Sequence, residues 1–319
     1  MKEIVAIVLN WNKAKLTIQS INNILNYEGE VSDIIVVDNG STSKEKEILI
    51  DYAKFHQFMI LKEEVIEEVI NINFMDALAS NEHRKYMILL NRNKGYAAGN
   101  NSGLKLANIM GYKYALIVNN DVIFEQPILQ YLKNIMQKYS NIAVAGPEIL
   151  SASHVSQGPF AKPGLLESIL RPLFYPFTLI LLKITAKKKE LQKNHSEVSI
   201  VYRVMGCCML MKMDAVKKAG YFDEHTFLYA EEAILSERLM EIGYKVGFVP
   251  GVYVRHLHAE TTKSQSTIRT FFMQLKSDIY YFQAYRKSRT IFILFFVVAQ
   301  SAMFFIWAPL LKKLKAIYH

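Results

Sequence analysis

The chain has 319 residues, which is enough to bury one large hydrophobic core or two smaller ones. Hydrophobic residues make up 51% and charged residues 21%, a composition that excludes an intrinsically disordered protein. The 38 Lys and Arg residues outnumber the 29 Asp and Glu residues, and the net charge of +9 indicates an anionic partner: a membrane, a phosphate ligand or a nucleic acid. We expect no nucleic acid partner, because no stacked aromatic and basic array or known reader motif appears.

The two cysteines, Cys207 and Cys208, are adjacent in an apolar run. This spacing excludes a disulfide framework and predicts packed thiols in a reducing compartment. Residues 1–3 lead straight into strand-like sequence, so we expect no signal peptide and a catalytic body that stays in the cytosol.

Short apolar runs and helical patterns alternate through the first half of the chain. The predicted strands cover residues 4–9, 33–37, 86–90, 114–118 and 142–149. The helix after the first strand is expected to bury Ala14, Ile18, Ile21 and Leu25, and the helix after the second to bury Ile48, Leu49, Tyr52 and Phe55. Residues 63–79 are acidic with a helical pattern. The alternation predicts an α/β fold with parallel strands joined by right-handed crossovers.

Polar residues follow these strands where an open α/β sheet presents its ligand-binding edge. Asn119-Asn120-Asp121 comes directly after the strand at 114–118. One carboxylate flanked by amides suits a divalent cation shared with phosphate oxygens, although a turn after a strand explains the tripeptide alone more simply. Asp38 ends the second strand, where it can accept hydrogen bonds from a base or ribose or can cap a helix.

Residues 91–103 contain three glycines and four asparagines at the start of a predicted helix. This composition lets the backbone approach a ligand closely. The segment has neither a G-x-G-x-x-G pattern nor a Walker lysine, so it is neither a dinucleotide-binding motif nor a P-loop.

An ordered set of motifs resembles family 2 glycosyltransferases, and especially the subgroup that includes bacterial rhamnosyltransferases of cell-surface polysaccharides. The motifs are Val8-Leu9-Asn10-Trp11-Asn12, Val36-Val37-Asp38-Asn39-Gly40-Ser41, Asn93-Lys94-Gly95-Tyr96-Ala97-Ala98-Gly99-Asn100-Asn101 and Asn119-Asn120-Asp121. Residues 204–210, 220–224 and 227–232 agree with the family pattern, as do Arg238, Gly243 and His256. The resemblance covers roughly residues 3–260 and is far more specific than any single motif.

The resemblance implies a GT-A fold, with a Rossmann-like nucleotide-sugar half over residues 1–125 and a mixed-sheet acceptor half over residues 126–260. It implies an inverting glycosyltransferase that moves a sugar from a UDP- or dTDP-linked donor to a lipid-linked saccharide in the synthesis of capsule, O-antigen or another surface polysaccharide. The residues it assigns to nucleotide-sugar binding are Asn10, Asn12, Asp38, Asn39, Gly40, Asn93, Gly95, Tyr96, Gly99, Asn100, Asn119 and Asn120. Those it assigns to acceptor binding are Gly206, Cys207 and Arg238.

The resemblance also implies a divalent metal, Mn²⁺ or Mg²⁺, held by Asp121 and His256. His256 and His258 are two apart in a strand-like run, so both side chains are expected on one face. A histidine on a strand surface is a common alternative. The resemblance selects His256 alone as a metal ligand.

Glu231 and Glu232 stand where the family has Glu-Asp, and Ile234 stands where a further acid is often found. The resemblance implies that Glu232 is the catalytic base and that Glu231 is a structural or acceptor-binding neighbour. Acids in the first turn of a helix are also ordinary partners of the helix dipole. Two other functions stay open: a catalytically silent scaffold of a polysaccharide assembly complex, and a nucleotidyltransferase.

Three apolar segments predict contact with a membrane. Residues 165–185 are interrupted by prolines, which favours an interfacial or loop-like segment over a spanning helix. Residues 271–285 carry aromatics at helical spacing, and residues 291–311 are almost wholly apolar and long enough to span a bilayer. Lys and Arg crowd both ends of 291–311, which also allows an in-plane helix. We expect residues 261–319 to attach the protein to the cytoplasmic face of the cell membrane, peripherally or as a single-pass protein, with spanning preferred.

Overall fold

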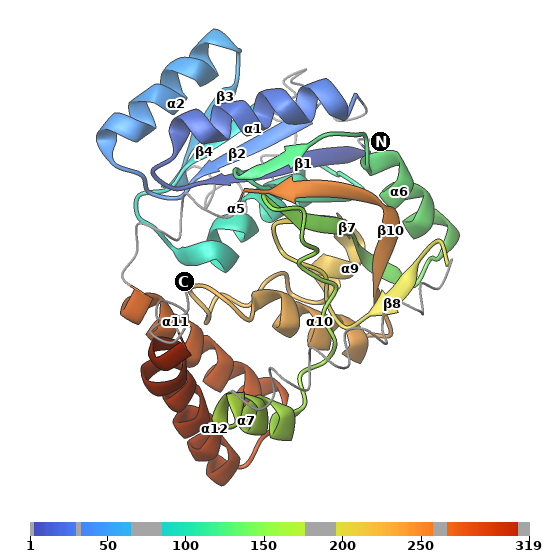
Figure 1. Cartoon of the computed structure of the whole chain (residues 1–319). Coiled ribbons are helices and arrows are strands. Elements are labelled where there is room, and N and C mark those ends of the chain that lie inside the picture. Colours follow the sequence, from blue (N-terminus) through green and yellow to red (C-terminus); the bar gives the residue numbers. More distant parts are fainter. Residues whose placement is uncertain (1–2, 30–32, 65–84, 176–195, 258–266, 312–319) are drawn as a thin grey trace. The chain divides into compact units, whose positions relative to one another are not determined.

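The computed structural model describes residues 3–29, 33–64, 85–175, 196–257 and 267–311 (Figure 1). The chain divides into two compact units. The first, which we call the α/β unit, comprises residues 1–161 and 197–265. The second, the helical unit, comprises residues 162–196 and 266–319. A segment from the middle of the chain therefore groups with the C-terminal segment.

The α/β unit is built on one ten-stranded sheet. The strand order is β3-β4-β2-β1-β5-β9-β7-β10-β6, and β8 pairs with β10. The strands are β1 (Ile4–Asn10), β2 (Asp33–Asp38), β3 (Met59–Lys62), β4 (Lys85–Leu89), β5 (Tyr114–Asn119), β6 (Val122–Phe124), β7 (Ile142–Ser151), β8 (Ser199–Val201), β9 (Cys208–Lys212) and β10 (Lys245–His256). The pairs among β1 to β5 are parallel, whereas β9 runs antiparallel to both β5 and β7. The sheet thus has a parallel half and a mixed half, as predicted.

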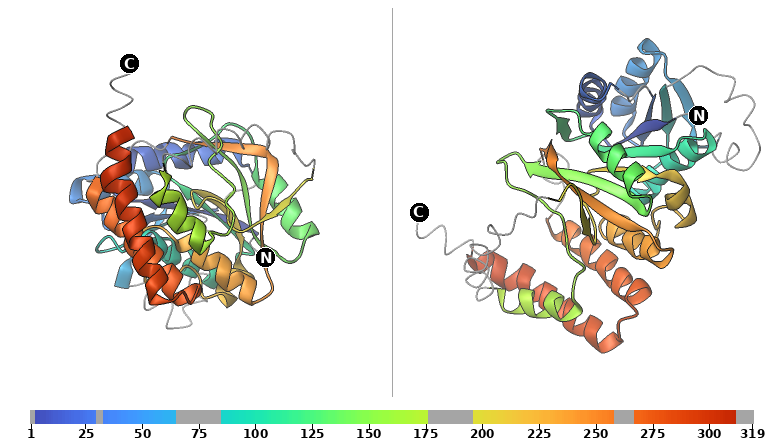
Figure 2. Two further views of the ribbon diagram at one scale, coloured as in Figure 1. Left: turned by 60° about the horizontal axis from the view of Figure 1, so that its bottom comes forward. Right: turned by 90° about the vertical axis from the view of Figure 1, so that its right-hand side faces the viewer.

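Helices cover both faces of this sheet (Figures 1 and 2). They are α1 (Ala14–Tyr27), α2 (Ser43–Phe55), α5 (Gly95–Ile109), α6 (Leu129–Lys138), α9 (Met213–Lys218) and α10 (Glu231–Glu241). Ile4, Ala6 and Val8 of β1 pack into one core with α1, α2 and α6. Val5 and Ile7 pack into the other core with α5, α9 and α10. The alternation along β1 explains why the sequence shows an unbroken apolar run: both faces of the strand are buried.

The five predicted strands all form, with small differences at their ends. The prediction that Phe55 points inward is wrong, because its side chain is 84% exposed. Leu49 and Ala53 face the core from α2, and Phe55 lies two residues beyond Ala53, about 200° further around the helix. Strands β3, β6 and β8 were not predicted. Nearly all of the helix predicted over residues 63–79 lies outside the described residues.

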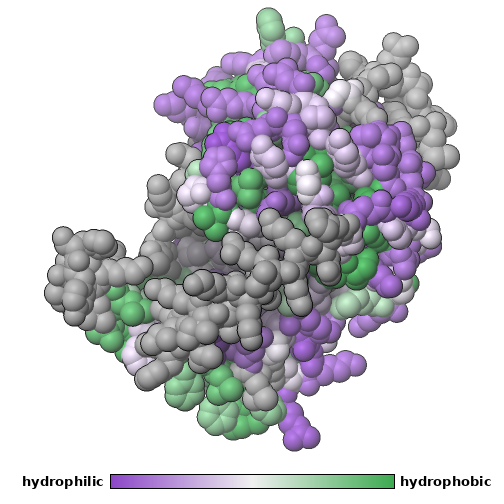
Figure 3. Space-filling model, turned by 45° about the vertical axis from the view of Figure 1, so that its right-hand side comes forward, coloured by the Kyte–Doolittle hydropathy of each residue, from purple (hydrophilic) through white to green (hydrophobic). Residues whose placement is uncertain are grey.

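The helical unit contains α7 (Leu165–Leu173), α11 (Thr267–Tyr280), the π-helical turn η1 (Tyr281–Tyr285), α12 (Thr290–Ala302) and the π-helical turn η2 (Met303–Trp307). Thr290–Leu311 is one continuous helical stretch of 22 residues with a mean hydropathy of 2.3. Within the described part of the chain it is the one helix whose length and composition would allow it to cross a membrane. On the face drawn in Figure 3, hydrophobic side chains gather over this unit.

Candidate active site

The predicted ligand-binding residues meet at the carboxyl edge of the parallel strands. Asn10 at the end of β1 lies opposite Asp38 at the end of β2. On the other side of β1, Leu9 lies opposite Asn119 at the end of β5. Because the three strands run parallel, the polar segments that follow them are brought to one edge.

A chain of buried hydrogen bonds holds this edge together. Asn10 donates its Nδ2 hydrogen to Oδ1 of Asp38 over 2.8 Å. Thr17 Oγ1 donates to Oδ1 of Asn10 over 2.7 Å and accepts from Nδ2 of Asn120 at 2.9 Å. The other Asp38 oxygen accepts the N–H of Ser41 at 3.3 Å. These side chains hold the loops in place, and a role of Asp38 in contacting a base or ribose stays a prediction.

The asparagines and glycines of the next two loops also contact one another. Asn39 Nδ2 donates to Oδ1 of Asn93 and to the carbonyl of Gly95, each over 3.0 Å. Gly40 has a φ of +68°, and a Cβ there would lie 2.2 Å from the carbonyl carbon of Arg92. A Cβ at Gly99 would lie 2.7 Å from Leu9. Close packing between loops therefore explains these glycines, and their contact with a ligand stays a prediction.

Two further predicted nucleotide-sugar residues differ in their surroundings. Asn12 accepts the N–H of Thr42 at its Oδ1 over 2.7 Å and donates its own N–H to Ser41. Asn100 is fully buried and donates to the carbonyl of Tyr96 over 3.1 Å. Its Oδ1 has no hydrogen-bond partner among the described residues. An unsatisfied buried amide oxygen is uncommon, and the contact of Asn100 with a nucleotide sugar stays a prediction.

Asp121 and His256 come together as the resemblance implied. Nε2 of His256, at the end of β10, lies 3.1 Å from Oδ1 of Asp121, and both side chains are nearly buried. The two atoms are within ion-pair distance, and Oδ1 of Asp121 has no properly oriented hydrogen bond within the described residues. Nδ1 of His256 lies 3.3 Å from Oε1 of Gln157. With a proton on Nδ1, Nε2 would turn its lone pair toward the carboxylate, an arrangement that suits a shared cation.

The described residues contain no group of three or more His, Cys, Asp and Glu side chains that could hold a metal. The assignment of Asp121 and His256 as metal ligands stays a prediction. One or two carboxylates with phosphate oxygens and water are sufficient for Mg²⁺, and Mn²⁺ accepts the same oxygen donors. His258 lies outside the described residues.

Glu231 and Glu232 open helix α10. The two preceding residues, Tyr229 and Ala230, have left-handed backbone with φ of 72° and 66°. Non-glycine residues rarely adopt this conformation, and its strain is a feature of functional sites. The left-handed pair turns the chain abruptly into the helix and fixes where the two acids point.

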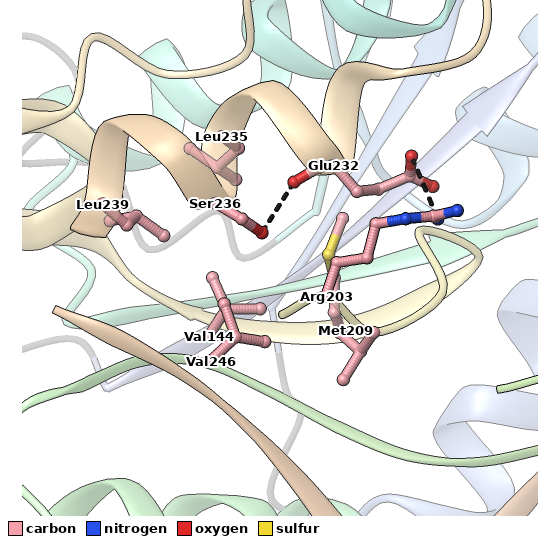
Figure 4. A pocket seen from close by; sticks show the side chains of 9 residues that line it. Val144, Arg203, Met209, Glu232, Leu235, Ser236, Leu239 and Val246 are labelled. Carbon is pink, nitrogen blue, oxygen red and sulfur yellow. Dashed lines mark hydrogen bonds and ion pairs between the residues drawn. The ribbon is translucent and has the colours of Figure 1, made fainter. Parts of the chain in front are cut away.

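The Glu232 carboxylate is positioned by Gly206 and by Arg203, which Figure 4 shows beside it. Oε1 accepts the N–H of Gly206 at 3.0 Å, and Oε2 lies 4.0 Å from the Arg203 guanidinium. The guanidinium in turn stacks on Phe160 at 4.0 Å from the ring centroid. The Glu232 side chain is 17% exposed, whereas residue Glu231 is only 4% exposed. Glu232 is therefore the acid of the pair with more access to a substrate.

A cavity of about 10 Å³, the size that one water molecule needs, lies behind this carboxylate. Its wall is mostly apolar and comes from α10 and the strands beneath it. It is lined by Val144, Arg203, Val204, Met209, Glu232, Leu235, Ser236, Leu239 and Val246. This cavity is too small to hold a sugar. It lies beside the Glu232 carboxylate and is not the substrate-binding pocket.

Tyr96 makes hydrogen bonds to two other segments of the candidate site. Its hydroxyl donates to the carbonyl of Gly206 over 2.7 Å, and its N–H donates to the carbonyl of Phe227 over 2.8 Å. Burial raises the pKa of the Tyr96 hydroxyl well above its usual value, and nearby Glu232, Glu231, Cys207 and Asp121 raise it further. Two hydrogen bonds thus join the start of α5 to the segments around Gly206 and Phe227.

Cys207 and Cys208 are buried, as predicted for packed thiols. Burial raises the pKa of the Cys207 thiol well above its usual value, and Cys208, Asp121 and Glu232 add to the effect. Cys207 therefore lies near Asp121 and Glu232 as a neutral thiol. Its proposed contact with an acceptor stays a prediction.

Arg238, which was predicted to bind the acceptor, contacts other residues of the protein. Its guanidinium pairs with the buried Asp223 at 3.0 Å and approaches the carbonyls of Gly220 and Tyr221 at 3.5 and 3.4 Å. These contacts hold the turn before α10, so acceptor binding by Arg238 stays a prediction.

Three residues of the site were missed in the sequence. Gln157 contacts His256, Arg203 contacts Glu232, and Thr17 joins Asn10 to Asn120. Each acts on a partner far away in sequence. Of the three, only Arg203, a basic residue three positions before Gly206, could have been noticed from the sequence alone.

Comparisons with known proteins agree with this arrangement. The family model described as glycosyl transferase family 2 matches residues 5–220. The chain is 26% identical over 151 residues to the N-acetylglucosaminyl-diphospho-decaprenol L-rhamnosyltransferases of two Mycobacterium tuberculosis strains, CDC 1551 / Oshkosh and ATCC 25618 / H37Rv. The match covers 47% of this chain, and the chain spans about half the length of the curated relatives it matches, 48%.

A solved structure shares the fold. It is the crystal structure of GalNAc-T7 with UDP, GalNAc and Mn²⁺, with a TM-score of 0.59 and 13% sequence identity over 89% of this chain and 48% of that chain. At this identity the likeness shows the fold alone, and together with the family match it confirms the predicted GT-A type of α/β fold. Since the family model matches well over half of the chain, the protein belongs to glycosyl transferase family 2.

Proposed function

We propose that the chain is an inverting glycosyltransferase that moves a sugar from a nucleotide diphosphate sugar to a saccharide carried on a lipid. The observation that carries this proposal is a set of contacts at Gly206 and Cys207. Gly206 donates its N–H to Glu232 and accepts from the Tyr96 hydroxyl, and the Cys207 carbonyl accepts the N–H of Asn119, two residues before Asp121. Glycosyl transfer needs two things: the negative charge of the leaving diphosphate must be offset, and the acceptor hydroxyl must lose a proton. The two parts of the site match these two needs.

Asp121 and His256 are the residues that would hold a divalent cation. Their facing atoms are 3.1 Å apart, close to the separation of about 3 Å between neighbouring ligand atoms around an octahedral ion with bonds of about 2.1 Å. A bound Mn²⁺ or Mg²⁺ ion would offset the charge of the leaving diphosphate. Gln157, 3.3 Å from Nδ1 of His256, would orient the ring so that Nε2 faces the cation.

Glu232 would act as the base. Its Oε1 is oriented by the N–H of Gly206, and its exposure leaves the carboxylate within reach of an acceptor hydroxyl. The hydroxyl oxygen would form a bond to the anomeric carbon while the bond from that carbon to the phosphate oxygen breaks. The proton passes to Glu232, the nucleoside diphosphate leaves, and the anomeric configuration inverts.

The relatives support the substrate class. They are N-acetylglucosaminyl-diphospho-decaprenol L-rhamnosyltransferases. We therefore infer a UDP- or dTDP-linked hexose or deoxyhexose donor and a diphospholipid-linked saccharide acceptor in surface polysaccharide synthesis, such as capsule or O-antigen. Such an acceptor is membrane-bound, and the apolar stretch Thr290–Leu311 supports attachment to the cytoplasmic face of a membrane.

The test is a product assay with full-length protein in detergent, Mn²⁺, a panel of UDP- and dTDP-sugars, and N-acetylglucosaminyl-diphospho-polyprenol as the acceptor. We expect release of nucleoside diphosphate that depends on the acceptor, and a linkage of inverted configuration by NMR. The Glu232→Gln variant, which lacks the proposed base, is the negative control. Release of pyrophosphate would indicate a nucleotidyltransferase instead, and binding of none of the donors would indicate a silent scaffold. Either outcome overturns the proposal.

A further inference from the structure

The long apolar helix of the helical unit is fastened along one side to α7. Gln300 donates its Nε2 hydrogen to the carbonyl of Ser168 over 3.1 Å, and Trp307 donates its Nε1 hydrogen to the carbonyl of Leu173 over 3.0 Å. The two helices therefore run side by side in the same direction (Figure 2). Gln300 is at the middle of Thr290–Leu311, so Ser168 lies beside the midpoint of that stretch.

Helix α11 lies along the same stretch in the opposite direction. Phe271 stacks on Phe304 with ring centroids 4.3 Å apart, and Phe282 of η1 contacts Phe296 at 5.0 Å. Lys276, which is exposed, lies between these two contacts along α11. It is therefore also near the middle of the apolar stretch.

These neighbours carry charges that a spanning arrangement would place deep in lipid. Glu167 and Arg171, on either side of Ser168, have side chains that are 67% and 52% exposed. Were Thr290–Leu311 to cross a bilayer, both side chains and Lys276 would lie near the bilayer centre, where charged groups are strongly disfavoured. Helix α7 has nine residues, about 13 Å of helix, and cannot cross the roughly 30 Å hydrocarbon core beside it.

An exposed apolar stripe runs along the other side of the stretch. Its members recur every three or four residues on one face, apart from a break near residue 302: Ile291, Leu294, Phe295, Val298, Phe305, Ile306 and Leu310, each 44–60% exposed. Ile293, Phe296 and Ala299 of the same helix are buried instead. The helix is apolar all round, but α7 and α11 cover one side of it. They expose the charged side chains Glu167, Arg171 and Lys276 beside the apolar side chains Leu170, Phe174, Ile268 and Phe272. The unit as a whole is therefore amphipathic.

The charge of the unit fits an anionic lipid surface. Its described residues contain seven Lys and Arg residues, Lys162, Arg171, Arg269, Lys276, Arg286, Lys287 and Arg289, against two acidic residues, Glu167 and Asp278. Basic residues beside an apolar stripe attract anionic headgroups within a Debye length. Two copies of this unit facing each other would repel through their like charge, so an anionic membrane fits this surface better than a second copy does.

We propose that the helical unit lies in the plane of an anionic membrane surface, with the stripe from Ile291 to Leu310 in one leaflet and the charges of α7 and α11 on the water side. This inference deepens the membrane attachment proposed above and decides between its two forms. The protein would dip into one leaflet without crossing the bilayer.

The first measurement is co-sedimentation of full-length protein with preformed vesicles. We expect binding to vesicles that contain phosphatidylglycerol and at least tenfold weaker binding to phosphatidylcholine alone. Phe295→Glu should weaken binding at least tenfold, while Phe55→Glu, a matched change at an 84% exposed aromatic in the α/β unit, should not. Equal binding of Phe295→Glu and wild type, or no binding at all, would overturn the proposal. So would vesicle-free dimers that Phe295→Glu dissociates.

The second measurement separates in-plane from spanning attachment. Arg171→Cys and Leu294→Cys are each treated with a membrane-impermeant maleimide, in membranes and in detergent, with the wild-type protein giving the background from Cys207 and Cys208. We expect Arg171→Cys to react equally fast in both and Leu294→Cys to be protected at least tenfold in membranes. Protection of Arg171→Cys in membranes would establish spanning. Neither measurement depends on turnover, so a protein that binds vesicles but transfers no sugar contradicts only the proposed activity.

Discussion

Gly206 donates its backbone N–H to Oε1 of Glu232 over 3.0 Å, and a Cβ atom at position 206 would lie 2.3 Å from that same oxygen. The contact that orients the carboxylate therefore requires the absence of a side chain. Gly206→Ala should push the Glu232 carboxylate aside and lower kcat by about 10–100-fold, because small displacements of a reacting group are costly. Steady-state kinetics would measure this, together with donor binding, which should stay within a few-fold.

Gly29→Ala is the matched control for that substitution, since a Cβ there meets nothing within 4 Å. It should leave kcat unchanged. If Gly206→Ala is as active as Gly29→Ala, the carboxylate of Glu232 is not held for catalysis by this contact.

The two acids of α10 should respond differently to neutralisation. Glu232→Gln should lower kcat by about 10²–10⁴-fold, the usual contribution of a general base, with little change in donor affinity. Glu231 is buried beside Tyr229, whose pKa is raised by burial and by Glu231, so Glu231→Gln should lower the melting temperature more than kcat. Thermal unfolding and initial rates on both variants check this. A dead Glu231→Gln enzyme with an active Glu232→Gln enzyme would exchange the two roles.

Asp121 should be needed for the metal and not for the fold. Its Oδ1 makes no oriented hydrogen bond with the described residues and lies 3.1 Å from Nε2 of His256, so Asp121→Asn removes a charge and alters only that contact at this oxygen. We expect the melting temperature to change by only a few degrees, while Mn²⁺ affinity in the presence of nucleoside diphosphate falls at least tenfold. Isothermal titration reports the metal directly. Glu125→Gln, which alters a partly exposed ion pair with Arg255, should leave the affinity intact.

Stability should fall with rising pH above about 8.5, in part through Cys208. Burial, with Glu28 nearby, raises the pKa of this thiol in the folded protein. Above the unfolded pKa of about 8.5 the unfolded chain loses the proton while the folded chain keeps it. Each such group lowers the free energy of unfolding by about 1.4 kcal/mol per pH unit. Cys208→Ala should therefore show a shallower decline between pH 9 and 10.5 in denaturant titrations; an unchanged slope would contradict this.

The sequence predicted the strands well because β1, β2 and β5 are buried on both faces and read as unbroken apolar runs. The pairing of Asp121 with His256 came only from the family resemblance, since nothing local connects a loop after β5 to the end of β10. The hydrogen-bond partners of the asparagines could not be predicted from the sequence. Asn10, Asn39 and Asn93 look like ligand-binding residues in sequence, yet each hydrogen-bonds to another residue at the sheet edge. An amide does not reveal its partner until the fold brings that partner close.

The bond between Tyr96 and Phe227 has a consequence for the order in which substrates bind. It joins the loop that starts α5, on the donor side, to the segment that leads through Ala230 into the catalytic acids. Gly95 presses on the same carbonyl so closely that no Cβ would fit. A nucleotide that shifts the donor loop therefore shifts the base as well. We expect a compulsory sequence in which the donor enters first and the nucleoside diphosphate departs last, a pattern that product inhibition would reveal as competition between the nucleoside diphosphate and the donor alone.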